Sequence, residues 1–422
     1  MLMTRTISDP ALIKEKVLNW LHRFSTFCFL DSCALPGQSL DFIAGAGAVS
    51  AFEASQNDAL EAFGEYQKKR QGKWLLGHLG YELNTSGPEA LSNKTDQLLF
   101  PDICFFEPEI VLQLKEGILE IDAADPAAVY DAILNIPADT TAVGSPVVLQ
   151  PRVKKAAYLQ AIEALQKHIH RGDCYEINYC IEFFAEDTVI DPFTIYRQLT
   201  KKTPAPFAGL YRLQDKWLVC ASPERFLKKT GSNIISQPIK GTLPRHAQDG
   251  VLLAGERENL LNSQKDRAEN VMVVDLVRND LSRICREGSV RVDELFGIYS
   301  FAQVHQMVST VSGVLPDNYA FPDMLKATFP MGSMTGAPKV SVMKLIDQHE
   351  QAKRGIFSGS IGYISPDGDF DLNVVIRSLM YNHSTKYLSC KVGSGITIYS
   401  EAAKEWEECL LKAKAIEEVL KG

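Results

Sequence analysis

Hydrophobic residues in the first 120 positions occur as short runs separated by turns. Three of these runs, FCFLDSC (27–33), WLLGHLGYEL (74–83) and ICFFEPEIVLQL (103–114), are rich in aromatic and β-branched residues, which favours strands. Residues 123–151 are rich in Ala, Pro, Asp and Thr, a composition that predicts a connection. We therefore expect a strand-rich N-terminal region, residues 1–150, followed by a second region over 151–422.

An amphipathic helix is predicted directly after this connection, in KKAAYLQAIEALQKHIHRG. Tyr158, Ile162, Leu165 and Ile169 recur at helical spacing and form one apolar stripe. Gly172 follows the last of them, and glycine is a common helix end. The stripe indicates a helix that packs on the core along one side.

The rest of the chain mixes strands and helices without regular alternation. Strands are predicted in WLVCASPERFL, SGSIGYIS and YLSCKVGSGITIYS, and helices over 263–284, 338–349 and 401–420. A doubly wound parallel sheet requires regular alternation, so it is disfavoured. We predict an α+β fold with antiparallel sheets.

Composition narrows the class of protein only a little. The chain has 422 residues, which suits two domains or one large domain with an intertwined core. Its net charge of -8 and well-mixed charges argue against nucleic-acid binding, which needs a concentrated basic face. Nine scattered cysteines without zinc-ligand spacing favour a reduced, intracellular protein. With no secretory signal and no apolar run long enough to span a bilayer, we expect a cytoplasmic protein that does not enter the membrane.

Two side chains are candidates for catalysis, one at the end of a predicted strand and one in a constrained segment. Glu224, in SPERF, follows the strand WLVCA; it is either a catalytic carboxylate or a glutamate in a surface turn. Lys240, in SQPIKGTLPR, lies between Pro238 and Pro244 and is followed by Gly241, so its backbone is constrained. A desolvated lysine in such a frame can act as a nucleophile, and the alternative is a solvated lysine in a hairpin loop.

Two predicted helices each carry a pair of carboxylates spaced three residues apart. Asp266 and Glu269 form one pair, and Glu405 and Glu408 form the other. Each pair shares a helix face, and carboxylate oxygens are ligands that Mg²⁺ prefers. Two such helices facing each other could bind Mg²⁺. Ordinary charge pairing on a solvated face, for example with Lys412, is the alternative.

Three further segments could bind an anion. The loop FPMGSMTGAPK (329–339) leads into a helix near Pro338, where exposed backbone N–H groups can bind a carboxylate; its glycine spacing differs from that of a phosphate-binding P-loop. Arg377 lies inside DLNVVIRSLM, an otherwise apolar predicted strand, and needs an anionic partner, either a substrate carboxylate or a structural residue such as Asp371. Gly393 and Gly395 could admit a ligand to the backbone or form a bulge.

Taken together and in order, these segments resemble the chorismate-utilising enzymes, the family of anthranilate, aminodeoxychorismate, isochorismate and salicylate synthases. The resemblance is carried by GDCYEIN, SPERF, PIKGT, KDRAENVMVVDLVRND, FPMGSMTGAPK, RGIFSGSIGY, IRS, GSG and EWEE. It implies an α/β sandwich of two antiparallel sheets packed face to face with helices outside, like that of anthranilate synthase component I. It also implies that chorismate and Mg²⁺ bind between the sheets.

The same resemblance assigns roles to the candidate residues. Glu269 and Glu408 are expected to ligate Mg²⁺, with Glu405 and Asp266 as nearby ligands. The ion is expected to hold the ring carboxylate, aided by the loop backbone, while Arg377 and the GSG glycines hold the enolpyruvyl carboxylate. The implied substrate-binding set comprises Asn178, Thr242, Thr335, Gly336, Ala337, Lys339, Arg377, Gly393 and Gly395.

Lys240 points to one branch of this family. Anthranilate synthases have alanine at the matching position, whereas lysine-using aminodeoxychorismate synthases have PIKGT. The implied reaction is covalent: neutral Lys240 adds at C2 of chorismate as Glu224 protonates the departing 4-hydroxyl. Ammonia then adds at C4 and expels Lys240 from C2, in the route to para-aminobenzoate and folate. Asn178 stands where water-adding relatives have a lysine base. Because no GxCxG-type nucleophile elbow is present, ammonia is expected from a partner glutamine amidotransferase, component II.

Two other readings stay open. Anthranilate synthase component I is the alternative activity, and a non-catalytic binding homologue is the alternative of another class. The chain also departs from the family pattern. Gln306 stands where relatives commonly have histidine, with His305 one residue earlier, and Phe357 replaces a Tyr or Trp. The tryptophan-feedback segment of anthranilate synthases is present only as FLDS (29–32), so feedback by tryptophan is not assumed.

Overall fold

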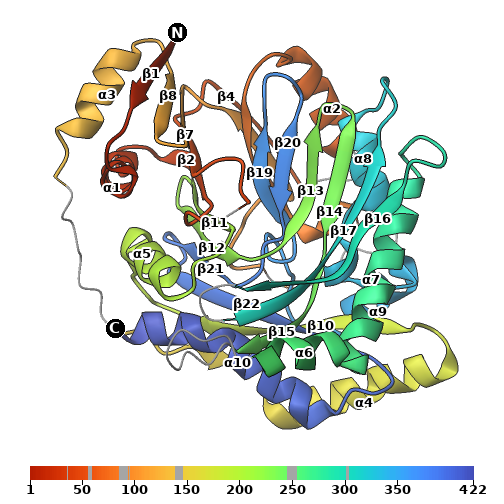
Figure 1. Ribbon diagram of the computed structural model, residues 1–422. Helices are drawn as coiled ribbons and strands as arrows, with labels where there is room; N and C mark the ends of the chain where they lie inside the picture. The colour runs from red at the N-terminus through yellow and green to blue at the C-terminus, as the bar shows by residue number, and fades with distance from the viewer. Residues whose placement is uncertain are drawn as a thin grey trace.

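The computed structural model describes residues 1–35, 37–55, 59–84, 94, 96–137, 146–244, 254–300 and 304–422. Two sheets of antiparallel strands lie face to face, and the helices pack on their outer sides (Figure 1). The α+β sandwich predicted from the sequence is therefore confirmed. All strand pairs of the described segments are antiparallel.

One sheet contains 12 strands among the described residues, and strands from both halves of the chain share it. Its order is β1 (Leu2–Thr6), β8 (Ile118–Asp122), β7 (Ile110–Lys115), β3 (Phe42–Ala46), β2 (Thr26–Asp31), β11 (Phe207–Leu213), β12 (Lys216–Ser222), β21 (Ser378–Asn382), β22 (Tyr387–Ile396), β10 (Glu176–Ala185) and β18 (Gly336–Ala337), with β9 (Gln150–Pro151) beside β10.

The second sheet contains 10 strands among the described residues. Its order is β15 (Ile239–Pro244), β17 (Val304–Val314), β14 (Asn233–Gln237), β13 (Arg225–Thr230), β20 (Phe370–Asn373), β19 (Ser360–Ile364), β5 (Leu75–Leu79), β6 (Ile103–Glu107) and β4 (Ser50–Ala54), with β16 (Arg291–Ser300) beside β17. This sheet, too, draws strands from before and after residue 150.

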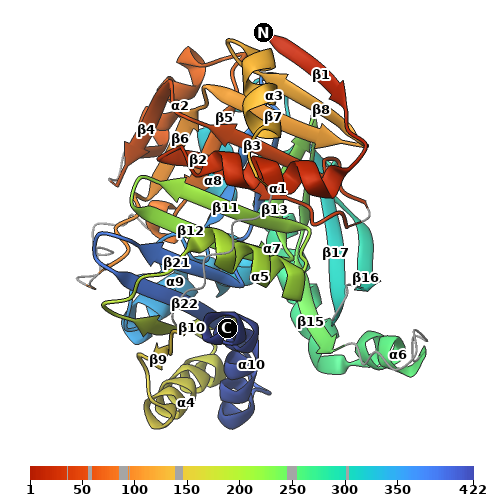
Figure 2. The same cartoon turned by 90° about the vertical axis from the view of Figure 1, so that its left-hand side faces the viewer.

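The helices close the outer faces of the sheets. They are α1 (Pro10–Leu21), α2 (Ala59–Lys69), α3 (Pro126–Leu134), α4 (Lys155–Arg171), α5 (Pro192–Lys202), α6 (Ala254–Asn262), α7 (Gln264–Ser282), α8 (Phe321–Thr328), α9 (Lys339–His349) and α10 (Ala402–Lys421). The helices predicted over 263–284, 338–349 and 401–420 correspond to α7, α9 and α10. Figure 2 shows α6 at the end of β15, away from the helices α4 and α10.

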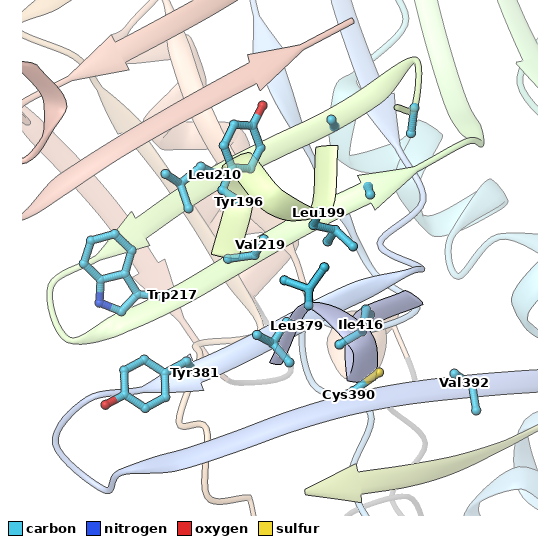
Figure 3. Close-up of a cluster of buried hydrophobic side chains, with 14 of the residues drawn as sticks. Tyr196, Leu199, Leu210, Trp217, Val219, Leu379, Tyr381, Cys390, Val392 and Ile416 are labelled. Atoms are coloured by element: carbon cyan, nitrogen blue, oxygen red, sulfur yellow. The ribbon is translucent and has the colours of Figure 1, made fainter. Parts of the chain in front are cut away.

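The apolar stripe of α4 and its neighbours fill one of two cores. Tyr158, Ile162, Leu165 and Ile169 are all buried, as the helical spacing predicted. They join α5 and α10 in the core that covers the outer face of the 12-stranded sheet; Figure 3 shows part of it, where Leu199 of α5 faces the strands. The other core lies between the two sheets and continues under α2, α7 and α8.

The structure corrects several predicted elements. The stretch 103–114 is two strands, β6 and β7, which belong to different sheets; the break falls at Pro108, between their ends. The predicted connection 123–151 contains α3, which Asp125 caps by accepting from the N–H of Ala128. Short-range composition missed these features because a proline can end a strand as well as begin a helix.

Candidate active site

The site is built around strand β10, whose two faces differ in chemistry. Ile177, Tyr179 and Ile181 point into the core under the helices, whereas Glu176 and Asn178 alternate with them. Successive side chains of a strand point to opposite faces, so the polar residues face the interior between the sheets. All of β10 except Phe184 is buried, and the polar side chains therefore need partners.

Lys240 supplies the partner of Glu176. Its ammonium nitrogen Nζ lies 2.6 Å from Glu176 Oε1, and the two side chains are only 10% and 3% exposed. Burial alone would lower the pKa of Lys240, but Glu176, with Glu269 and Glu224 behind it, reverses this effect and raises the pKa above its ordinary value. Lys240 is thus held as a charged ammonium in the free protein.

Because Gly395 has no side chain, it leaves space for the ion pair of Lys240 and Glu176. A Cβ atom at this position would lie 2.8 Å from Glu176 Oε1 and 3.1 Å from Lys240 Nζ. It would also lie 3.7 Å from Glu269 Oε2, so the three charged groups converge on one point of β22. Protein side chains therefore lie directly against the GSG backbone at Gly395, and the expected approach of a ligand to this segment stays a prediction.

Glu224 lies between β12 and β13 and is 4% exposed, so it is not the surface glutamate of a turn. Burial raises the pKa of its carboxyl to about 7, although Ser333, Lys240 and the backbone of Ile239 partly offset this effect. A carboxyl group with this pKa can carry a proton near neutral pH and donate it to a leaving group. The Glu224 carboxyl and the Lys240 ammonium therefore interact electrostatically.

The four predicted metal ligands come from α7 and α10. Burial raises the pKa of Glu269 to about 7, with Lys240 and Lys265 opposing it, and no residue of the described segments donates a hydrogen bond to its buried Oε1. Lys265 lies 3.8 Å from Glu269 Oε1 and 3.1 Å from Glu405 Oε1 and so links the two helices. Glu405 is buried and also accepts from the hydroxyl of Ser394.

The remaining two carboxylates are arranged differently. Glu408 lies 2.8 Å from Lys412. Burial alone would raise the pKa of Glu408, but Lys412 and other nearby lysines lower this pKa below its usual range. Asp266 packs near Gly241, and its backbone N–H is capped by Ser263. Among the described residues no three His, Cys, Asp or Glu side chains gather as a metal-ligand cluster, and Glu269, Glu405 and Glu408 each lie within 3.8 Å of a lysine.

The predicted anion-binding loop lies against β10. The Asn178 side chain donates to the carbonyl oxygen of Ser333 at 2.8 Å, and its backbone N–H donates to that of Thr335 at 2.8 Å. Gly336 (φ +147°) pairs with Ile177; a Cβ atom there would lie 2.0 Å from the Glu176 carbonyl oxygen. This close approach explains why glycine stands at this position.

Arg377 differs from its predicted setting. It lies in the bend between β20 and β21, where the chain crosses from one sheet to the other, and not inside a strand. Asp371, a partner we considered, instead makes two bonds to Arg225, at 2.9 and 3.1 Å, so that alternative is wrong. Within the described residues, the half-buried guanidinium of Arg377 forms no ion pair and donates no side-chain hydrogen bond. Glu408 is the charged group that interacts with it electrostatically.

Not every predicted substrate-binding residue faces this neighbourhood. The Lys339 ammonium is held by Asp280 at 2.6 Å and by the carbonyl oxygen of Thr328, and the Thr335 hydroxyl donates back into its own loop. Ala337 and Gly393 are placed beside β10, at Glu176 and Cys180 respectively. The backbone of Thr242 pairs with Gln306, and its side chain lies outside the described part of the structure.

Sequence reasoning missed three residues of this site. Glu176, which pairs with Lys240, stands in the GDCYEIN segment, where only its alternation with apolar neighbours could have indicated an inward position. Lys265 opens the KDRAEN segment, where the neighbouring carboxylates are the stronger signal of chemistry. Arg354, which lies behind the site, falls between α9 and β19, where no periodicity applies.

With this fold and this set of acid, lysine and carboxylates in view, comparison with known proteins defines the class. The profile of the chorismate binding enzyme family matches residues 27–418, and the chain belongs to that family. Anthranilate synthase component I from Streptococcus pneumoniae superposes with a TM-score of 0.77 at 26% identity, covering 93% of this chain and 92% of that chain.

Proteins with similar sequences include two aminodeoxychorismate synthases and an anthranilate synthase component I-like protein. The chain is 42% identical over 264 residues to aminodeoxychorismate synthase component 1 of Klebsiella aerogenes and 39% identical over 267 residues to that of Escherichia coli. Each alignment covers 63% of this chain and 58% of the relative. An anthranilate synthase component I-like protein of Synechocystis is 34% identical, over 83% of this chain and 73% of the relative. None of the helices in the described segments is both long and apolar enough to serve as a membrane span.

Proposed function

We propose that this protein aminates chorismate at C4 to give 4-amino-4-deoxychorismate, using ammonia from a partner glutamine amidotransferase. The observation that carries the proposal is Lys240, buried beside Glu176 and within the electrostatic reach of Glu224. The relatives named as component 1 of aminodeoxychorismate synthase support the activity and, by that name, a second component. The product is a precursor in the route to para-aminobenzoate and folate.

The charged state of Lys240 adds a step to the expected mechanism. An ammonium is not a nucleophile, so Glu176 must first accept its proton across their 2.6 Å contact. Neutral Lys240 then bonds to C2 as the C4–oxygen bond breaks, and Glu224 donates its proton so that the hydroxyl leaves as water. Ammonia adds at C4 as the Lys240–C2 bond breaks. Glu224 takes a proton from the added nitrogen, and Glu176 returns one to Lys240.

The four carboxylates of α7 and α10 provide oxygen atoms, the kind of ligand that Mg²⁺ prefers. Glu269 has a buried oxygen without a hydrogen bond and a raised pKa, which are the marks of a carboxylate that lacks a cation. We propose that Glu269 and Glu408 hold Mg²⁺, with Glu405 and Asp266 nearby. When bound, the ion would supply positive charge to the ring carboxylate of the substrate. Arg377, without a partner among the described residues, is the candidate for the second carboxylate.

The test is turnover of chorismate with Mg²⁺ and ammonium, with the products separated by chromatography. We expect aminodeoxychorismate from the natural sequence. Lys240→Ala should lose C4 amination by at least a hundredfold, while Lys228→Ala, which changes a lysine on β13 that donates to the hydroxyl of Ser39, should retain it. Unchanged amination by Lys240→Ala would contradict the covalent route, and no turnover by the natural protein would contradict the activity.

Anthranilate synthase component I is the second candidate, and the same experiment separates the two. It is favoured by the structural likeness to the Streptococcus pneumoniae protein and by the Synechocystis relative. Direct addition of ammonia at C2 with loss of the 4-hydroxyl as water, followed by loss of the enolpyruvyl group as pyruvate, would give anthranilate without a covalent bond to Lys240. Anthranilate as the main product would therefore replace our proposal.

A further inference from the structure

A second polar cluster lies behind the candidate active site, around the buried pair of Glu350 and Arg354. Arg354 is 2% exposed and follows α9 in the connection to β19. Its Nε and Nη2 donate to the two carboxylate oxygens of Glu350 at 3.0 and 2.6 Å. This bidentate pairing fixes the plane of the guanidinium, because both groups are planar and buried.

The guanidinium also reaches three acceptors outside this pair. Nη2 donates to the carbonyl oxygen of Asn178 at 2.8 Å, and Nη1 donates to that of Met334 at 2.5 Å and to the Ser358 hydroxyl at 3.5 Å. Arginine has five N–H donors in a fixed plane, and here five hydrogen bonds are made. The geometry of one side chain thus sets the relative positions of several backbone segments.

Two of these acceptors belong to the walls of the candidate active site. Asn178 lies on β10, two residues from the Lys240 partner Glu176, and Met334 lies in the loop 331–337 that runs beside β10. The loop residue Ser333 lies next to Glu224. Arg354 therefore bridges the strand that carries the partner of the lysine and the loop that contacts the acid.

The cluster is anchored on its other side by the N-terminal part of the chain. The Arg354 guanidinium stacks over the ring of Tyr81 at 4.4 Å. The backbone N–H groups of Arg354 and Gly355 donate to the carboxylate of Glu82 at 2.9 and 3.0 Å. Cys180, the next inward residue of β10, donates its N–H to Glu350 at 2.8 Å. Arg354 and Glu350 are thus held in place by contacts with Tyr81, Glu82 and Cys180.

We propose that Arg354 is a positioning residue: it holds the loop 331–337 at a set distance from β10 so that both face the substrate together. It touches neither the substrate nor the reacting atoms. The consequence for turnover rests on the proposed function, whereas the consequence for the loop does not. A lysine at this position keeps the charge beside Glu350 but has one donor atom in place of three, so it cannot hold both carbonyl oxygens in the same geometry.

The experiment uses Arg354→Lys in the full chain, with Arg197→Lys as the matched control. Arg197 is half-buried and pairs with Glu15 at 2.7 Å and Asn19 at 2.6 Å, between α5 and α1. Hydrogen exchange followed by mass spectrometry reads the peptides over 174–181 and 331–338. We expect exchange in these peptides to rise at least tenfold in Arg354→Lys and to stay unchanged in Arg197→Lys.

Kinetics provide the second readout. Arg354→Lys should raise the KM for chorismate at least tenfold and change the KM for ammonium less than twofold, a split that general destabilisation would not produce. If Arg354→Lys does not fold, Glu350→Gln, which keeps the size of that side chain but removes its charge and one of the two oxygens that accept from Arg354, should show the same pattern with smaller changes. Unchanged exchange in both peptides, or increased exchange with unchanged kinetics, would overturn the proposal. If the natural protein does not aminate chorismate, the proposed function fails, and the exchange data alone decide whether Arg354 positions the loop.

Discussion

At the scale of single residues, opposite charge states are set within one small neighbourhood. Burial favours the neutral form of Glu224 and Glu269, whose pKa values rise to about 7, while the neighbouring carboxylates keep Lys240 charged. Groups whose environments push their pKa values apart are the usual mark of an acid and base pair. These pKa shifts lead to predictions that can be measured.

Glu224 should make the activity fall as pH rises. Its carboxyl must be protonated to act as the acid, so kcat should decline above about pH 7, where the proton is lost. Glu224→Gln should lower kcat by roughly a hundredfold or more and abolish this decline. A pH–rate profile of both proteins checks the result; an unchanged decline in the variant would assign it to another group.

The same substitution should make the fold more stable at alkaline pH. The pKa of Glu224 is higher in the folded protein than in the unfolded chain, so its stabilising effect is lost as pH rises through about 7. Removing the buried charge should increase the free energy of unfolding at pH 8 by on the order of 1–3 kcal/mol, and leave it nearly unchanged at pH 4. Urea unfolding at the two pH values measures the difference.

Glu176 should control the reactivity of Lys240 in the free protein. Glu176 is the carboxylate that raises the pKa of Lys240 most, so Glu176→Gln should lower that pKa and increase the neutral fraction at pH 8 to 9. We expect an amine-reactive reagent to label Lys240 at least tenfold faster in the variant. Lys404, which is exposed, provides the reference within the same digest. Equal labelling of Lys240 in both proteins would show that Glu176 does not hold its proton.

At the scale of elements, the helix α7 matters because it carries Asp266 and Glu269. Ser263 is its N-cap and accepts from the N–H of Asp266. By contrast, Lys154 at the start of α4 makes no side-chain cap bond. Substitution of Ser263 can therefore be compared with substitution of Lys154, which occupies the same position at the start of α4 but makes no cap bond.

Ser263→Ala should lower the free energy of unfolding by about 0.5–2 kcal/mol, because the first turn of α7 loses its acceptor. Lys154→Ala should change it by only a few tenths of a kcal/mol. Chemical denaturation of the two variants measures both values. A similar loss in the two proteins would mean that the cap bond contributes little to the stability of α7.

At the scale of the whole molecule, the N-terminal region completes both sheets. β2 pairs with β11 in the 12-stranded sheet, and β5 pairs with β19 in the other. Removing residues 1–150 would expose β11 and β19 as long unpaired edges and would open the core between the sheets. The predicted boundary near residue 150 is therefore not a boundary between independent sheets.

A chain of residues 151–422 alone should not fold into an active protein. We expect it to aggregate or to lack a cooperative unfolding transition, because both sheets end at unpaired strands. Expression together with a separate 1–150 chain should restore solubility at least in part. Size-exclusion chromatography and circular dichroism distinguish the outcomes; a monomeric, cooperatively folded 151–422 chain would show that the second region is a domain in its own right.

Much of this protein could be predicted from the sequence because its signals are local. The apolar stripe of α4 requires only helical periodicity, and Glu224 could be expected at a strand end because WLVCA reads as a strand. The ordered motifs identified the family, since they combine many residues whose individual meaning is weak. These inferences depend on neighbours along the chain, and the chain alone contains them.

Tertiary structure decided what depends on contacts between distant segments. The pairing of Lys240 with Glu176 joins residues 64 positions apart, and the pairing of Arg225 with Asp371 joins residues 146 positions apart. The charge state of Lys240 follows from three carboxylates on three different elements, and Arg354 gains its role from strands and loops that no periodicity connects. Electrostatic energy and hydrogen bonding depend on distance in space, and only the folded chain sets those distances.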